Sequence, residues 1–591
     1  MRIGLLTEGG YPYVSGDARL WCDRLVRGLG QHDFDLYALS RTERQENEGW
    51  IELPPQVGRV RTAPLWTAAD DGVVYGRRAR RRFAECYGEL VAALCASGPG
   101  GAGGPGGAQR QPGDSSGDSE EFCASEADRF SSALYGLAEL ARDEGGLVGA
   151  LRSERAVRAL ERACRAPGAL RTAREARVPD LLAVAAHLEQ ALRPLSLDWY
   201  GDDGLGSADL CHAASGGVAA LPGLVARHFF DVPLLVTEYG VRLRTHYLAS
   251  GAGPTAEAAP AVRALLAAFH GRLATEVYRQ AACVTPGNAH ARRWQERCGA
   301  DRDKLRTVYP GMEAAHFAEV GEAPDYTDPD TLVWVGRVEP AKDLMSLLHA
   351  FAEVRKEEPK TRLRVVGSAT GAEGEAYLGH CKALAAQLFP DEADGPHTVG
   401  DNPVSFEEIG GPELPTAADA YASGTVIVLS SVVEGFPVSL VEAMFCGRAT
   451  VSTDVGAVVE VIGGTGLVVP PRNPRALADA SVALLRDSER RARLGAAARA
   501  RALELFTVEQ NITAFHGIYL EIVSHCPVNR VVLDRSGEPL PFAVPAEAHV
   551  PGRWTGPVTR GAARGVPGWA AGPPVRATAP TAGTVATEGA R

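Results

Sequence analysis

Two glutamates eight residues apart, Glu434 and Glu442, flank the start of a predicted helix. They belong to SSVVEGFPVSLVEAM (430–444), which directly follows the apolar run TVIVL (425–429). Strand, loop and helix in this order place both carboxylates at different depths along one crevice wall. A carboxylate is a natural acceptor for the paired hydroxyls of a ribose or hexose. The alternative is structural: Glu434 stabilises a helix N-terminus and Glu442 lies on a solvated helix face.

The loop between these glutamates has the composition of an anion site. Pro437 suits the first turn of a helix, so the free amides around Gly435 and Phe436 would open toward the strand ends. Such amides bind phosphate oxygens or sugar hydroxyls. The segment therefore predicts a phosphate or sugar site.

A second strand-and-loop segment carries two cations. The predicted strand 331–336 ends at Gly336, and Arg337 and Lys342 follow it within one loop. Two cations at the carboxyl end of a strand can neutralise a diphosphate. The alternative is a solvated loop in which Asp343 starts the next helix.

Together these segments resemble the donor-site pattern of the family 4 glycosyltransferases, which have the two-domain GT-B fold. Three further segments are similar to the branch that includes the cytosolic glycosyltransferase of Pel exopolysaccharide synthesis. They read EGGYPYV (8–14), HAAS (212–215) and TPGNAH (285–290). The resemblance covers roughly residues 1–40 and 205–525.

This resemblance implies a role for each motif residue. Arg337 and Lys342 would hold the donor diphosphate, Glu442 the nucleotide ribose, and Glu434 with the amides after it the transferred sugar. It also implies a retaining hexosyltransferase with a UDP-sugar as the expected donor, no further cofactor and no essential metal. The sequence Asp328-Pro329-Asp330 superficially resembles a metal motif, but it lies in a predicted linker where a turn explains it better.

The N-terminal half departs from the family pattern. Gly16 would lie near a phosphate site, but Asp17 follows it where relatives have a second glycine, and Tyr239 stands where relatives have a histidine. His212 ends an apolar strand, where either a ligand contact or a buried core histidine fits. Asn288 is a candidate ligand contact or a helix cap.

Short β-branched runs alternate with helical patterns along the chain, which predicts an α/β architecture with parallel sheets. By resemblance this is GT-B: two facing, doubly wound, Rossmann-like domains. The predicted strands are 2–7, 34–39, 209–213, 233–237, 282–285, 305–309, 331–336, 362–366, 425–430, 449–453 and 467–469.

The predicted division has three parts. Residues 1–325 would form an N-terminal acceptor-side domain with a helical insertion at about 75–195. Residues 326–525 would form the nucleotide-sugar domain, whose last helix returns to the first domain, and 526–591 an irregular tail. The Gly- and Pro-rich stretch 98–121 is too poor in apolar side chains to offset its ordering entropy, so we predict disorder there.

The composition limits which classes of partner and which cell compartment fit this protein. The 591 residues carry a formal net charge of -12, which disfavours nucleic acid as a partner. The start lacks the apolar core of a signal peptide, no stretch is apolar enough to span a bilayer, and the 11 cysteines lie at irregular spacing without a CxxC pair. We therefore expect the cysteines to be reduced thiols and the protein to be cytoplasmic.

An arginine cluster at 77–82 precedes a helical pattern. Peripheral association with an anionic membrane, an acidic acceptor or an assembly complex is conceivable, but a solvated helix end in an arginine-biased chain is the plainer interpretation.

We predict a glycosyltransferase that moves a sugar from a nucleotide-diphosphate donor to an unknown acceptor hydroxyl in polysaccharide or glycoconjugate synthesis. Two alternatives stay open. One is a sugar-nucleotide-binding regulator of a polysaccharide assembly without catalysis. The other is an epimerase or phosphorylase on the same fold.

Overall fold

The structure is a computed structural model of the chain. It describes residues 1–16, 18–68, 71–96, 116–201, 203–249, 259–322, 330–390 and 402–528. The chain divides into two compact units. Unit 1 contains Met1–Pro286, Arg293–Arg306 and the chain from Phe515 on, and unit 2 contains Gly287–Arg292 and Thr307–Ala514. The predicted boundary at 325 and almost all of the predicted tail lie outside the described residues.

Unit 1 is built on a parallel sheet of six strands in the order β3-β2-β1-β4-β5-β6. Because β1 and β4 are neighbours, the order reverses between them. The strands are β1 (Arg2–Glu8), β2 (Asp33–Ser40), β3 (Val57–Pro64), β4 (Leu210–Ala213), β5 (Leu234–Glu238) and β6 (Cys283–Pro286).

Unit 2 repeats this arrangement with the order β12-β11-β10-β7-β8-β9, again all parallel. Here the order reverses between β7 and β10. Helices cover both faces, so the strands are buried apolar runs. The strands are β7 (Thr331–Val335), β8 (Arg362–Val366), β9 (Val404–Glu407), β10 (Val426–Leu429), β11 (Ala449–Thr453) and β12 (Leu467–Val469).

The two faces of β7 show how the unit 2 core is layered. Its residues are all buried, and successive side chains point to opposite faces. Leu332 and Trp334 pack into one apolar cluster, while Val333 and Val335 pack into another on the opposite face. The sheet therefore separates two cores. The helices of unit 2 are α13 (Ala318–Glu322), α14 (Leu344–Glu357), α15 (Gly371–Leu388), α16 (Ala417–Ala422), α17 (Val438–Phe445), α18 (Val458–Ile462), α19 (Pro474–Arg486) and α20 (Ser488–Leu505).

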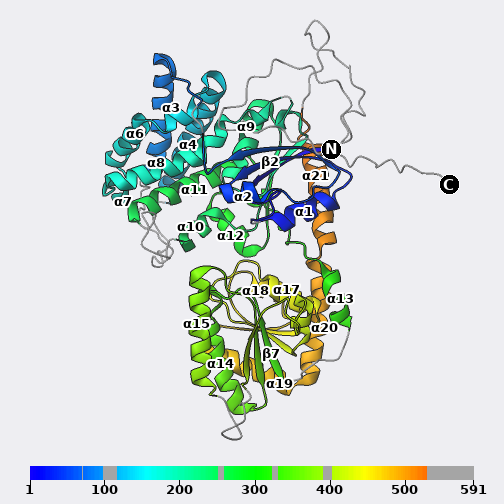
Figure 1. Cartoon of the computed structure of the whole chain (residues 1–591). Helices are drawn as coiled ribbons and strands as arrows, with labels where there is room; N and C mark the ends of the chain where they lie inside the picture. The colour runs from blue at the N-terminus through cyan, green and yellow to red at the C-terminus, as the bar shows by residue number, and fades with distance from the viewer. Residues whose placement is uncertain are drawn as a thin grey trace, which may run out of the picture. The chain divides into compact units, whose positions relative to one another are not determined.

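A helical insertion separates β3 from β4 in unit 1. In Figure 1 the helices α3, α4, α6 and α8 lie side by side. They share one continuous core with the unit 1 sheet. The insertion contains α3 (Arg77–Cys95), α4 (Ser116–Glu144), α5 (Leu147–Leu151), α6 (Glu154–Arg165), α7 (Arg171–Arg174) and α8 (Val178–Leu192).

The remaining helices complete unit 1, and two of them begin in unit 2. They are α1 (Arg19–Gly28), α2 (Glu43–Glu48), α9 (Leu221–Phe230), α10 (Arg242–Ala249), α11 (Pro260–Gln280), α12 (Ala289–Arg297) and α21 (Val508–His525). From Phe515 on, α21 belongs to unit 1, as the predicted return of the last helix requires.

The two parallel six-stranded sheets confirm the predicted α/β, doubly wound fold. The predicted strand 305–309 is wrong, since only Leu305 forms an isolated bridge. Strands β3 and β9 were missed because both are polar, partly exposed edge strands. Within the predicted disordered stretch 98–121, residues 98–115 lie outside the described part of the chain, whereas 116–121 form the start of α4 because the proline-rich composition ends before them.

Candidate functional site

A pocket of about 600 Å³ opens at the carboxyl ends of the unit 2 strands. Loops after β7, β8, β9 and β10 line it. It therefore lies where the strand order reverses, which is where open α/β sheets bind ligands. Its volume is in the range of small-molecule sites, about 300–1,000 Å³.

The loop after β7 carries the cations and is tied to the loop after β10. Lys342 ends a single 3₁₀ turn, and its carbonyl accepts a hydrogen bond of 2.7 Å from the Ser430 hydroxyl. The neighbouring Ala341 carbonyl accepts from the Val432 N–H at 2.9 Å. These bonds fix Lys342 relative to the segment that carries Glu434.

Two glycines let the loops after β7 and β8 approach closely. A Cβ added at Gly367 would lie 1.8 Å from the carbonyl oxygen of Gly336. A Cβ at Gly336 would lie 3.2 Å from the Trp334 ring beneath it. Any side chain at Gly367 would thus push the loop that carries Arg337 out of position.

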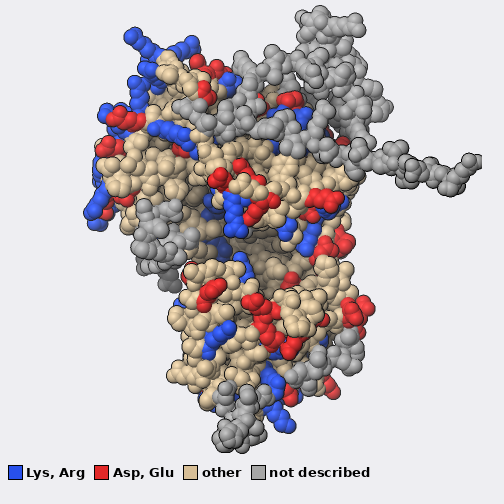
Figure 2. All heavy atoms as spheres, in the orientation of Figure 1, with Lys and Arg blue, Asp and Glu red and all other residues tan. Residues whose placement is uncertain are grey.

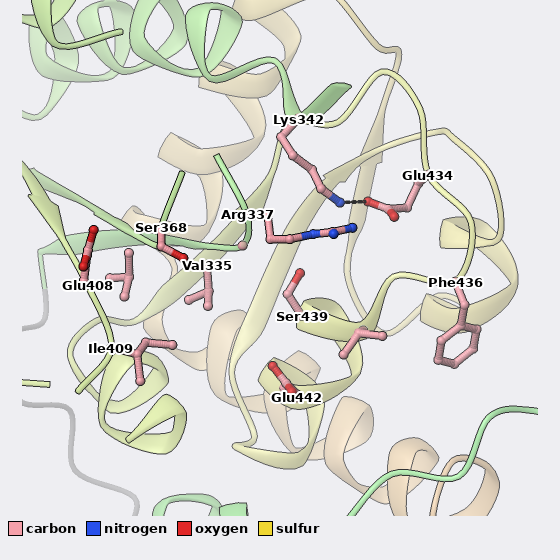
Figure 3. Close-up of a pocket in the computed structure, with 14 residues that line it drawn as sticks. Val335, Arg337, Lys342, Ser368, Glu408, Ile409, Glu434, Phe436, Ser439 and Glu442 are labelled. Carbon is pink, nitrogen blue, oxygen red and sulfur yellow. Dashed lines mark hydrogen bonds and ion pairs between the residues drawn. The ribbon is translucent and has the colours of Figure 1, made fainter. Parts of the chain in front are cut away.

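Glu434 forms an ion pair with Lys342, with Oε2 and Nζ 2.6 Å apart. The side chains are only 11% and 16% exposed, so solvent screens this pair less than a surface pair. The Ser431 hydroxyl donates to the same carboxylate oxygen at 3.1 Å. In Figure 3 the Arg337 side chain points toward this ion pair. The pair concentrates opposite charges at one end of the pocket.

Glu442 lines the pocket from α17 and accepts a hydrogen bond of 2.7 Å from the Tyr421 phenol. Burial raises the pKa of Tyr421 well above its usual range, and the nearby carboxylate adds to the shift. Tyr421 therefore stays protonated and donates. This bond orients one Glu442 oxygen and leaves the carboxylate positioned on the pocket wall.

The pocket combines charges, hydroxyls and apolar walls. Arg337 and Lys342 can hold a diphosphate, and Glu434 and Glu442 can accept from sugar hydroxyls. In Figure 3 Glu408 and Ile409 lie away from Lys342, across the pocket from Glu434. The full lining is Val335, Gly336, Arg337, Lys342, Val366, Gly367, Ser368, Glu408, Ile409, Glu434, Phe436, Val438, Ser439 and Glu442.

Two predicted loop residues border the pocket without lining it. The Gly435 N–H donates to Glu434 Oε1 at 3.3 Å, and its carbonyl accepts from Ala457 at 3.1 Å. Pro437 is buried and stands one residue before α17 begins at Val438. The Gly435 amide is thus partly occupied by a local bond.

The other predicted site residues lie elsewhere. Asn288 is buried, and its Oδ1 accepts from the Ala291 N–H at 2.8 Å, which is the helix-cap alternative. Gly16 lies in the loop after β1 of unit 1, with φ of 122° and its backbone against Gly9.

His212 lies in the core of unit 1. Its Nδ1 shares a hydrogen bond of 2.7 Å with the Tyr519 hydroxyl, and its Nε2 shares one of 2.7 Å with the Thr237 hydroxyl. Burial lowers the pKa of His212 to about 3, so the ring is neutral. Both nitrogens are occupied, and the structure therefore places His212 in the buried-core role rather than on a ligand.

Two of the four loops that line the pocket, those after β8 and β9, were not predicted from the sequence. Gly367 and Ser368 follow β8 in the same way that Gly336 and Arg337 follow β7, and this parallel was a usable signal. Glu408 and Ile409 follow the missed strand β9, and Ser439 lies between the two predicted glutamates.

Within the described part of the chain, no group of three or more His, Cys, Asp or Glu is arranged to hold a metal ion. Among the same residues, no helix is long and apolar enough to cross a membrane. Of the motif Asp328-Pro329-Asp330, only Asp330 is described.

A family model described as "Domain of unknown function (DUF3492)" matches residues 1–303, just over half of the chain. The chain belongs to this DUF3492 family. Residues 329–487 of the DUF3492 chain match a second model, "Glycosyl transferases group 1", and these residues contain the whole pocket. The paired parallel sheets and this match identify the GT-B fold.

Curated relatives include two proteins named D-inositol 3-phosphate glycosyltransferase. The one from Kineococcus radiotolerans is 31% identical over 223 residues, which cover 34% of this chain and 49% of the relative. The one from Jonesia denitrificans is 26% identical, covering 50% of this chain and 68% of the relative. The DUF3492 chain spans about half the length of most of the curated relatives it matches.

Solved structures with a similar fold include a sucrose-phosphate synthase from Thermosynechococcus elongatus. It is 15% identical with a TM-score of 0.49, covering 89% of the DUF3492 chain and all of the other. Anabaena Alr3699/HepE in complex with UDP and glucose is 14% identical with a TM-score of 0.47, covering 88% and 99%.

Proposed function

We propose that this protein is a glycosyltransferase that moves a hexose from a nucleoside-diphosphate donor, a UDP-sugar, to an acceptor hydroxyl. The observation that carries the proposal is the pocket at the switch point, where two cations and two carboxylates meet inside the region that matches glycosyl transferases group 1. The names of the curated relatives support the same reaction class. We further propose a cytoplasmic role in polysaccharide or glycoconjugate synthesis.

The pocket's charges support a specific orientation of the donor. Arg337 and Lys342 would bind the diphosphate, and Glu442, oriented by Tyr421, would accept from the ribose hydroxyls. The sugar would then lie beside Glu434. Arg337 and Lys342 supply the positive charge that a metal ion provides in other transferases, so we propose a metal-independent reaction.

We propose retention of the anomeric configuration. The bond between the anomeric carbon and the diphosphate oxygen breaks, and the acceptor oxygen forms its bond on the same face. The acceptor hydroxyl proton passes to the departing diphosphate. The cations stabilise the charge that develops on the leaving group, which is the term that lowers the barrier.

Titration calorimetry with UDP and a panel of nucleotide sugars, with and without EDTA, tests the donor site. Nucleotide release with a cell-extract acceptor then tests transfer. We expect binding that survives EDTA and release that needs the acceptor. Absence of nucleotide binding by folded protein would refute the proposal. Binding without release would indicate a regulator, and conversion without an acceptor would indicate an epimerase.

A further inference from the structure

Helix α3 begins with an arrangement that opposes its own stability. Its first six residues include Arg77, Arg78, Arg80, Arg81 and Arg82, with no acidic residue in the first turn and no side-chain cap. A helix N-terminus carries partial positive charge, and like charges three or four residues apart repel each other. An arginine-biased composition accounts for arginine in place of lysine, but it does not account for this placement.

Part of the cluster is neutralised within unit 1. Arg81 pairs with Glu85 at 2.7 Å, and Arg82 pairs with Glu139 of α4 at 2.6 Å. The remaining three, Arg77, Arg78 and Arg80, are exposed, and their side chains make no hydrogen bond or ion pair with any residue that the structure describes. In Figure 2 Lys and Arg gather along the outer edge of the insertion, at the upper left.

Two exposed valines precede these arginines. Val73 is 44% and Val74 is 80% exposed. The segment that carries them is anchored, because Asp71 accepts from the Val73 N–H at 3.1 Å and the Tyr75 phenol donates to the Gly145 carbonyl at 2.8 Å. The anchored backbone therefore presents apolar side chains to solvent directly beside unpaired guanidinium groups.

We propose that this arginine patch, Val73, Val74, Arg77, Arg78 and Arg80, docks the protein on an anionic lipid bilayer. Guanidinium groups pair with lipid phosphates, and valines enter the interface between headgroups and acyl chains. A polyanion in solution would use the arginines alone and leave the valines exposed. Since the chain as a whole carries a net charge of -12, attraction to an anionic surface must be local and sensitive to salt.

Flotation of the full-length protein with phosphatidylcholine vesicles, with and without phosphatidylglycerol, tests the proposal. We expect binding only when phosphatidylglycerol is present, and loss of binding at high salt. The triple variant Arg77→Gln, Arg78→Gln, Arg80→Gln should bind on the order of 100-fold more weakly, the effect of three surface arginines on an anionic membrane.

A charge-matched control comes from unit 1 itself. The side chains of Arg155, Arg162 and Arg293 are also exposed and make no hydrogen bond or ion pair among the described residues. Their triple Gln variant therefore changes net charge equally. Vesicle binding should change little in this control. Equal losses in both triple variants, or no binding of wild type, would overturn the proposal.

Val73→Ser with Val74→Ser separates a bilayer from a soluble polyanion. We expect weaker vesicle binding and unchanged binding of polyphosphate. Polyphosphate binding with vesicle binding indifferent to the valines would assign the patch to a soluble polyanion instead. Thermal unfolding measured on every variant reports whether unit 1 is folded, and it keeps this test separate from that of the donor site in unit 2.

Discussion

The carboxyl ends of the two sheets share a topology and differ in what they do with polar groups. In unit 2, Arg337, Lys342 and Glu434 line an open pocket at the strand switch point. At the corresponding end of unit 1, His212 and Thr237 are buried and bonded to each other. The same strand order thus supports a charged, accessible surface in one unit and a closed hydrogen-bond network in the other.

The unit 1 network extends along the strand ends. Thr237 shares a hydrogen bond of 2.6 Å with Thr285, and the fully buried Glu238 accepts from the Tyr278 phenol. Burial raises the pKa of Glu238. Buried polar groups that are all partnered order and rigidify a core, but they have no capacity left for a ligand. Polar residues at a strand end therefore indicate a site only when they are also accessible.

The largest expected effect is a loss of unit 1 stability on acidification, which should not occur to the same extent in unit 2. Burial lowers the pKa values of His212 and His270 to about 3 and of His32 to about 4, all in unit 1. Their folded pKa values lie below the usual value of 6.5, so stability present above pH 6.5 is lost as the pH falls. Three such groups can remove up to about 4 kcal/mol between pH 7.5 and 5.5.

Hydrogen exchange followed by peptide mass spectrometry measures this. Unit 1 peptides should lose protection on acidification before unit 2 peptides. His212→Gln removes one titrating group and should make the pH dependence of unit 1 shallower. Equal loss of protection in both units would show that the buried network does not distinguish them.

Among the substitutions in unit 2, Gly367→Ala should damage the pocket most. The added methyl group would meet the Gly336 carbonyl at 1.8 Å, so the loop must move. We expect unit 2 to lose up to about 3 kcal/mol of stability and UDP affinity to fall with it. Gly379→Ala is the control, because nothing lies within 4 Å of its added methyl group in helix α15, and it should be neutral or stabilising. Thermal unfolding and calorimetry report both effects.

Lys342→Ala should weaken UDP by roughly 1–3 kcal/mol, the scale of a charge-assisted hydrogen bond. It also leaves Glu434 without its cation. Lys356→Ala, an exposed lysine paired with Glu353 on α14, is the matched control and should bind UDP like wild type. Wild-type affinity in the Lys342 variant would remove the diphosphate assignment.

Glu434→Gln gives the smallest change in binding and the most specific one. Because Glu434 holds Lys342 in the unliganded pocket, neutralising it should free the cation and tighten UDP several-fold, about 1 kcal/mol. Turnover should nevertheless fall, since in the proposed donor orientation the transferred sugar lies beside this carboxylate. Weaker UDP binding would mean that the ion pair supports the site rather than competing with the ligand.

The sequence predicted the accessible pocket of unit 2 better than the buried hydrogen-bond network of unit 1. Strand, glycine, cation and paired glutamates are local patterns, so Gly336, Arg337, Lys342, Glu434 and Glu442 were found together, and the structure brings them to one pocket. The ion pair between Lys342 and Glu434 was not predicted, because it joins residues 92 positions apart.

The misses have physical causes. His212 has the same sequence context whether it binds a ligand or Tyr519, since its partner comes from α21 far along the chain. Glu408 escaped notice because β9, the strand before it, is a four-residue, half-buried edge strand without a strong apolar pattern. Ser368 follows the predicted strand β8, and its loop carries no charged residue next to the strand that would have marked it as a site. Long-range packing, rather than local propensity, decides such positions.

One buried tryptophan beside the pocket can report on it by fluorescence. Trp334 is the only tryptophan in the sequence of unit 2, and its ring lies directly beneath Gly336 and Gly367. Fully shielded from water, it should emit at short wavelength. Movement of the two glycine loops would shift or quench that emission. The chain has eight tryptophans, so the part of a fluorescence change that Trp334→Phe abolishes follows the occupancy of the pocket without a label.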